Sequence, residues 1–186
     1  MDRPAPDRLE LVRAFVNTRD IDTDTDALAD PARTVAWLIA AGLLPGRARV
    51  GPRTLERILS VREAFRGVLV AHADGKPADD SVEVLNRTAD KAGIAIRLSG
   101  PDSGTPVVVA NGVDGALGQL VAIAFGAIAD GTWRRLKACP SPTCQWAFYD
   151  ASRNRSSRWC DMGVCGNRAK RRAFQHRRHN AISSAV

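Results

Sequence analysis

Residues 139–165 read CPSPTCQWAFYDASRNRSSRWCDMGVC and contain all four cysteines of the 186-residue chain. The cysteines form two C-x4-C pairs, Cys139 with Cys144 and Cys160 with Cys165. Zinc is tetrahedral and binds thiolates well, so two close pairs joined by a hairpin predict a closed site for one structural Zn²⁺. Such a site has no open position for water or substrate, so we expect the metal to stabilise the fold rather than to catalyse.

Disulfides and a redox pair are the alternatives for these cysteines. Disulfides do not persist in a reducing cytosol, where we expect this chain to reside. The thioredoxin-type C-x-x-C spacing is absent. His176 and His179 are alternative ligands, but their i,i+3 placement within a run of arginines favours a solvated helix face. Zinc bound by the four cysteines is therefore the interpretation that we adopt.

The residues around the cysteines predict a small fold. Two prolines stiffen the first cysteine pair into a tight turn, and the alternating residues 145–149 predict the strand that leaves it. From Gly166 the pattern is helical, which places Cys165 at a helix N-terminus, where the dipole favours a thiolate. A turn, a hairpin and a helix with the last ligand make a treble-clef-like arrangement. We expect its aromatic residues to pack the core of the module rather than to stack on bases, namely Trp146, Phe148 and Tyr149.

Charge divides the chain into two parts. Residues 1–132 contain 15 Lys and Arg against 18 Asp and Glu, a net charge of −3. Residues 133–186 contain 12 Lys and Arg against 2 Asp, a net charge of +10. Four thiolates with one Zn²⁺ lower this value to about +8. The C-terminal part is therefore a separate basic unit, which points to an anionic partner such as nucleic acid.

The basic residues flank the cysteines as two groups. One group lies in the loop before Cys160, and the other lies on the helix after Cys165, where Cys165, Ala169 and Ala173 predict a narrow seam against the zinc site. Arg and Asn can address both phosphates and base edges. The candidate nucleic-acid-binding residues are Arg153, Arg155, Arg158, Asn167, Arg168, Lys170, Arg171, Arg172, Arg177 and Arg178. The alternative is a solvated cationic helix that serves solubility.

The N-terminal part predicts a mainly helical domain with one β-hairpin. Apolar spacing and turn residues indicate helices over 9–17, 32–41, 52–73, 79–92 and 115–130, and strands over 94–98 and 106–110. The whole chain is thus expected to be α+β. The alternating aspartates from Asp20 to Asp30 do not fit a calcium loop, because the required Gly and Glu are missing, and we expect a solvated loop whose carboxylates cap helices.

Several functional classes are disfavoured. The longest apolar run, 116–129, is interrupted by Gly and Gln and is shorter than the roughly 18–20 residues of a membrane span. No apolar stretch follows a basic one near Met1, so no secretory signal is expected, and we expect a cytoplasmic protein. No Ser/His/Asp set, Gly-rich phosphate loop or open metal site is present, so we expect no enzymatic activity.

Three motifs resemble a known family. Cys165-Gly166-Asn167-Arg168, the preceding Arg158-Trp159-Cys160-Asp161-Met162, and residues 148–154 (FYDASRN) closely resemble the CGNR zinc finger over roughly residues 135–178. Phe15-Val16-Asn17-Thr18 resembles the ABATE domain that usually precedes this finger. The family is described as stress-induced transcription regulators, mostly bacterial. The resemblance implies zinc ligands at the four cysteines, a DNA-binding finger, and an N-terminal domain that senses or assembles.

We therefore expect an ABATE-like, mainly helical regulatory or assembly domain at 1–132, a CGNR-type, treble-clef-like zinc finger with a basic helix at 133–180, and a disordered tail at 181–186. The expected function is a DNA-binding transcriptional regulator. An RNA-binding module and a protein-interaction adaptor remain alternatives. One small module rarely reads enough DNA for high specificity, which favours a homodimer. Asn167 and Arg168 have two open roles: they contact bases, or they brace the zinc module, with Arg168 paired to Asp150 or Asp161.

Overall fold

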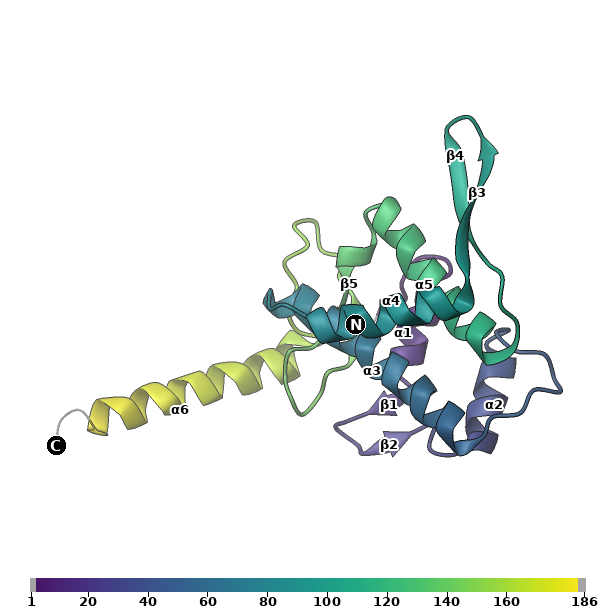
Figure 1. Ribbon diagram of the computed structural model, residues 1–186. Helices are drawn as coiled ribbons and strands as arrows, with labels where there is room; N and C mark the ends of the chain where they lie inside the picture. Colours follow the sequence, from purple (N-terminus) through teal and green to yellow (C-terminus); the bar gives the residue numbers. More distant parts are fainter. Residues whose placement is uncertain (1–2, 184–186) are drawn as a thin grey trace.

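The computed structural model describes the backbone of residues 3–183 and the side chains of this range except 176 and 178–183. Its α-helices are α1 (Leu9–Val16), α2 (Pro31–Ala40), α3 (Pro52–Asp74), α4 (Asp79–Ala92), α5 (Gly112–Ala129) and α6 (Asn167–Ser183). Its strands form three antiparallel pairs, which are β1 (Arg19–Asp20) with β2 (Thr25–Asp26), β3 (Ile94–Gly100) with β4 (Ser103–Val108), and β5 (Leu136–Ala138) with β6 (Ala147–Tyr149). Single turns η1 (Trp133–Arg135) and η2 (Met162–Gly166) complete the chain. The predicted α+β class, with a mainly helical N-terminal part, is confirmed (Figure 1).

Most helix boundaries follow the sequence signals. The Asp30 carboxylate accepts a hydrogen bond from the Arg33 N–H at 2.9 Å and caps α2, with Pro31 in the first turn. Gly75 ends α3 in the left-handed conformation that glycine adopts easily, at a φ of 77°. The start of α4 differs from the prediction. Ala78 is its first flanking residue, and no side chain caps it.

The β3–β4 hairpin is longer and tighter than predicted. The sequence places a Ser/Gly/Pro loop between strands at 94–98 and 106–110, whereas the ladder continues to a turn at 101–102. The Ser and Gly residues enter the strands because the cross-strand backbone hydrogen bonds outweigh their weak strand propensity. In Figure 1 the hairpin projects away from the helices, and only its base contacts them.

Helix α5 lies at the centre of the N-terminal part. Leu117 and Leu120 are fully buried, and α5 packs against α1, α4 and β4. At Gly118 a Cβ atom would lie 2.3 Å from the Cβ of Ala92, so glycine permits the close crossing with α4. The helix has 18 residues with a mean hydropathy of 1.6, long and apolar enough to cross a membrane. The apolar run 116–129 remains shorter than a span, and only the whole helix, which also contains Asp114, meets this test of length and composition, a test that the core helix of a domain also passes.

The hydrophobic core continues past the predicted domain boundary at 132. Trp133, Leu136, Ala138 and Ala147 belong to the same buried cluster as α1, α3 and α5. The ring of His72 on α3 meets Trp133 edge-on with centroids 5.4 Å apart, and its Nδ1 lies 2.8 Å from the Leu136 carbonyl oxygen. The β5–β6 pair is thus seated on α3, and it carries the cysteine sites at a fixed place on the body.

Candidate metal centre and nucleic-acid interface

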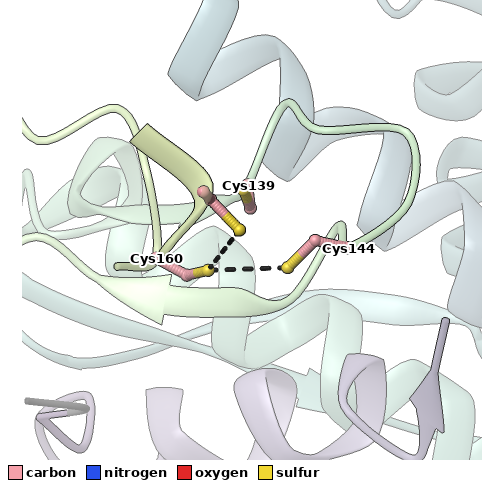
Figure 2. A group of neighbouring side chains, drawn as sticks. Cys139, Cys144 and Cys160 are labelled. Carbon is pink, nitrogen blue, oxygen red and sulfur yellow. Dashed lines mark hydrogen bonds between the residues drawn. The ribbon is translucent and has the colours of Figure 1, made fainter. Parts of the chain in front are cut away.

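The four cysteine sulfurs converge on one point. Cys139, Cys144 and Cys160 point toward one another in Figure 2, and all four ligand atoms lie within 4.8 Å of one another. The Cys144 and Cys160 sulfurs are 3.5 Å apart, and those of Cys160 and Cys165 are 3.8 Å apart. Sulfurs bound tetrahedrally to zinc at about 2.3 Å lie about 3.8 Å from each other. The spacing therefore fits a Zn²⁺ ion and is far longer than a disulfide bond of about 2.05 Å.

Two similar turns present the cysteine pairs. In the first turn, the N–H groups of Cys144 and Gln145 both donate to the Ser141 carbonyl oxygen, at 3.0 and 3.1 Å. In the second turn, the N–H groups of Cys165 and Gly166 both donate to the Asp161 carbonyl oxygen, at the same two distances. The backbone thus curls around each ligand pair, as a zinc knuckle requires.

The crowding of the four thiols favours a bound cation. Hydrogen bonds from the Cys144 and Cys160 thiols lower the pKa of Cys139, and sharing a proton with Cys139 raises the pKa of Cys144 to about 12 and raises that of Cys160. Burial raises the pKa of Cys165. Four thiolates therefore coexist here only when a metal neutralises them. A zinc ion held by this set supplies structural stability, because the four sulfurs complete its coordination.

A buried ion pair shapes the arginine loop between β6 and Cys160. The Lys137 ammonium donates to the Asp150 carboxylate at 2.7 Å, and both side chains are at least 93% buried. Lys137 also donates to the carbonyl oxygens of Arg155 and Ser157, at 2.7 and 2.9 Å. Burial opposes the ionisation of Asp150, but hydrogen bonds from Lys137, Ser152 and Ser157 outweigh it and lower the pKa of Asp150 to about 2. The loop backbone is therefore held from inside, while the side chains of Arg153, Arg155 and Arg158 are exposed.

Each residue after the last ligand has a distinct contact. At Gly166 a Cβ atom would meet the thioether of Met162, so the Met162 side chain packs directly over this glycine. The Asn167 amide donates to the Gly163 carbonyl oxygen at 2.9 Å and braces the second turn. The Arg168 guanidinium donates to the carboxylate of Asp22 on the β1–β2 hairpin at 3.1 Å. The two partners expected for Arg168 were wrong, because Asp150 is bound by Lys137 and Asp161 accepts the Val164 N–H.

Helix α6 leaves the zinc site and extends away from the body (Figure 1). The predicted seam of Cys165, Ala169 and Ala173 is shorter than expected, since Cys165 is buried and Ala169 half-buried but Ala173 is exposed. Beyond the first turn the described side chains of the helix are exposed. Its exposed basic residues are Arg168, Lys170, Arg171, Arg172 and Arg177. The side chains of Arg178, His176 and His179 lie outside the described residues. Backbone helix continues to Ser183, into the predicted tail, and residues 184–186 also lie outside the described part.

Of the predicted aromatic residues, Trp146 packs in the zinc module as expected, whereas Tyr149 packs against the core of the N-terminal part. Phe148 is buried, Tyr149 packs against the main core, and Trp146 packs against the cysteine cluster together with Trp159. The aspartates of the β1–β2 region have local partners instead of forming a metal site. Asp20 accepts the Asp22 and Thr23 N–H groups, and the cysteine group is the one metal-like cluster found among the described residues.

Polar contacts connect the chain that follows the first cysteine pair, at Gln145 and Ala147, to the end of α1. We call this set of contacts the joint. The Asn17 amide pairs with the Ala147 backbone in both directions, donating to its oxygen at 2.9 Å and accepting from its N–H at 2.7 Å. The fully buried Arg66 guanidinium donates to the carbonyl oxygens of Gln145, Val16 and Arg19 at 2.7 to 3.2 Å. Sequence reasoning missed these roles of Asn17 and Arg66, and those of Lys137 and Asp150. The one available signal was the Phe15-Val16-Asn17-Thr18 motif, whose Asn17 is the joint residue.

The comparison with protein families agrees with this architecture. The ABATE family model, described as "Putative stress-induced transcription regulator", matches residues 9–131, well over half of the chain. The chain belongs to the ABATE family. The CGNR zinc finger model matches residues 135–178, which include the four cysteines and most of α6. The finger model and the sulfur geometry together support one structural zinc ion. No curated protein matches the chain. This ABATE protein is thus a zinc-binding member of a family of regulators.

Proposed function

We propose that this ABATE protein is a transcription regulator that binds duplex DNA through α6 and the arginine loop. The observation that carries the proposal is the exposure of helix α6. The helix begins at the zinc site, and its described side chains beyond the first turn are all exposed. No Asp or Glu follows Asp161 in the sequence, so nothing on the helix neutralises its cations. A helix with this charge attracts a polyanion and gains affinity by releasing counterions.

The dimensions of the basic surface fit a DNA duplex. Helix α6 has 17 residues and is about 25 Å long at about 1.5 Å per residue. The major groove of B-DNA is about 12 Å wide and admits one α-helix. Arg171 and Arg172 lie in the second turn of α6, and we assign them to contacts with base edges and phosphates in the groove. The exposed loop arginines at 153, 155 and 158 precede the second cysteine pair, and the buried Lys137 holds the loop backbone at Arg155 and Ser157, so we assign these arginines to phosphate contacts.

Two features favour DNA over the alternatives. The deep, narrow major groove of A-form RNA excludes a helix, whereas α6 is a bare helix with few stacking residues. An adaptor that binds proteins would not need an uninterrupted cationic helix, and its binding would not depend steeply on salt. The ABATE body then serves as the assembly or sensing domain, and the stress response, the cytoplasmic location and the lack of enzymatic activity remain parts of this proposal.

The first experiment is a selection of the zinc-loaded, full-length protein against random duplex DNA at moderate salt with excess competitor. Enrichment of one motif is expected, and its symmetry reports how many copies bind. RNA of the same sequence serves as competitor. Loss of DNA binding to the RNA would favour the RNA alternative, and no salt-dependent binding to either would favour the adaptor.

A matched pair of variants tests the assigned surface. The double variant R171A/R172A removes two cations from α6, and R47A/R49A removes two exposed cations from the loop before α3. For R171A/R172A we expect weaker binding and a salt slope reduced by about 2, as counterion release predicts for two lost phosphate contacts. R47A/R49A should change neither. Equal effects of the two variants would show that net charge alone matters and would contradict the assignment to α6.

A further inference from the structure

Helix α5 has a face that the body does not cover. Its residues are almost all apolar, yet only 39% of the helix is buried within the described structure. Phe125 and Ile128 are 49% and 57% exposed. Large apolar side chains on a helix this hydrophobic are costly to leave in water, and a cluster of them usually marks an interaction site.

The β3–β4 hairpin extends this apolar face away from the body. Its register pairs Ile96 with Pro106 and Leu98 with Gly104, and strand alternation places these residues on one face with Ile94 and Val108. At the base, Val108 packs against Gly118 of α5. Farther out, Ile96 is 57% and Leu98 76% exposed. Figure 1 shows this outer half of the hairpin standing clear of every helix.

A groove lies between the hairpin base, α5 and the segment before α1. Its volume is about 750 Å³. Its apolar lining comes from Leu9, Pro106, Val108, Ala122 and Ile123, together with the backbone at Gly126. A Cβ atom at Gly126 would meet nothing within 4 Å, so the groove is open at this point. One chain thus has a projecting apolar hairpin and, beside it, an apolar hollow.

We propose that a second copy of this chain occupies the groove, and that the hairpin of each protomer packs against α5 of the other. A projection and a hollow on one surface are what a two-fold symmetric, self-complementary interface requires. The residues Ile96, Leu98, Phe125 and Ile128 expose on the order of 500 Å² together, which is a large part of the about 800 Å² that each partner contributes to a standard interface.

The charge around the groove favours a second copy over a membrane. The charged residues that line the groove are Asp7, Arg8 and Asp130, two acidic and one basic, and residues 1–132 have a net charge of −3. Anionic lipid surfaces bind basic rims and repel such a surface. The net positive charge of the chain lies instead in residues 133–186, whose helix α6 points away from the hairpin in Figure 1. A dimer formed through α5 would also supply two basic helices for two half-sites.

The test is the mass of the zinc-loaded, full-length protein in solution without DNA, by sedimentation equilibrium in high salt. Twice the chain mass of 20.0 kDa is expected. The variants L98E and I128E place a carboxylate on the hairpin and on α5, at side chains exposed enough to leave the fold intact. Each should weaken self-association by at least about tenfold, because an unpaired charge is costly in an apolar interface. V82E is the matched control, since Val82 is 45% exposed on α4, a helix that contributes no residue to the groove, whereas the hairpin and α5 both do.

Thermal unfolding followed by circular dichroism checks that each variant is folded. A wild-type monomer across the accessible concentrations would overturn the proposal. So would a dimer that L98E and I128E do not weaken, or one that V82E weakens equally. A monomer that co-sediments with phosphatidylcholine/phosphatidylglycerol vesicles would assign the face to a membrane instead. The DNA experiments are independent, because this measurement uses no DNA and alters no residue of α6.

Discussion

The ABATE body and the zinc module bury different materials. The body buries complete apolar side chains, such as Phe15, Phe65 and Leu117, along α1, α3 and α5. The module buries cysteine sulfurs, one Lys–Asp pair and a few aromatic rings, and the described side chains of its last helix are exposed beyond the first turn. The difference teaches that the same chain uses apolar burial where it needs a rigid body and a metal where it needs a small base for an exposed helix.

Loss of zinc should produce the largest difference in stability between the two regions. For C160S, or for the wild type with a chelator, we expect residues 139–166 to lose hydrogen-exchange protection, while α3 and α5 keep theirs. The cost to the module is on the order of 10 kcal/mol, as in zinc-finger peptides. Protection throughout the module in a zinc-free C160S protein would contradict the structural role of the metal.

The buried ion pair is the next most important contact of the module. The change D150N removes the charge that Lys137 faces and should lower the free energy of unfolding by about 3–5 kcal/mol, because it leaves a buried ammonium unpaired. Chemical denaturation of the zinc-loaded protein measures this. D102N, at the exposed turn of the β3–β4 hairpin, is the control and should have no effect. A similar loss in both variants would mean that the pair has no special role.

The next prediction concerns the joint at Asn17, which should couple the unfolding of the ABATE body to that of the zinc module. N17A leaves the Ala147 backbone N–H without its partner and should cost about 1–3 kcal/mol. We also expect two unfolding transitions by calorimetry where the wild type shows one. N86A changes an exposed asparagine on α4 and serves as control. One unchanged transition in N17A would show that core packing around Leu136 and Trp133 couples the regions without the amide.

The surface ion pair should have the smallest effect. Asp22 and Arg168 are 52% and 44% exposed, so a double-mutant cycle of D22N and R168Q should give less than about 1 kcal/mol of coupling. A larger coupling energy would indicate that the β1–β2 hairpin positions α6, and it would extend the body's influence to the basic helix.

The zinc site and the apolar elements were predictable from the sequence for a physical reason. The spacing of the cysteines identifies the zinc ligands directly. Gly75 and Gly93 mark the ends of α3 and α4, because glycine adopts the left-handed backbone conformation there more easily than other residues. The joint was not predictable, because Asn17 and Ala147 are separated by 130 residues and the motif that contains Asn17 does not name its partner. The same holds for Arg168, whose partner Asp22 lies in a stretch that reads as an ordinary solvated loop.

The separation of Asn17 and Ala147 also bears on biosynthesis. A pairing across 130 residues forms only after nearly the whole chain has left the ribosome. Until then Arg66 has no Gln145 carbonyl to bind, and the polar end of α1 is left open to water. Zinc therefore binds late in synthesis. The N-terminal part is incompletely packed until the C-terminal residues 133–186 have been made.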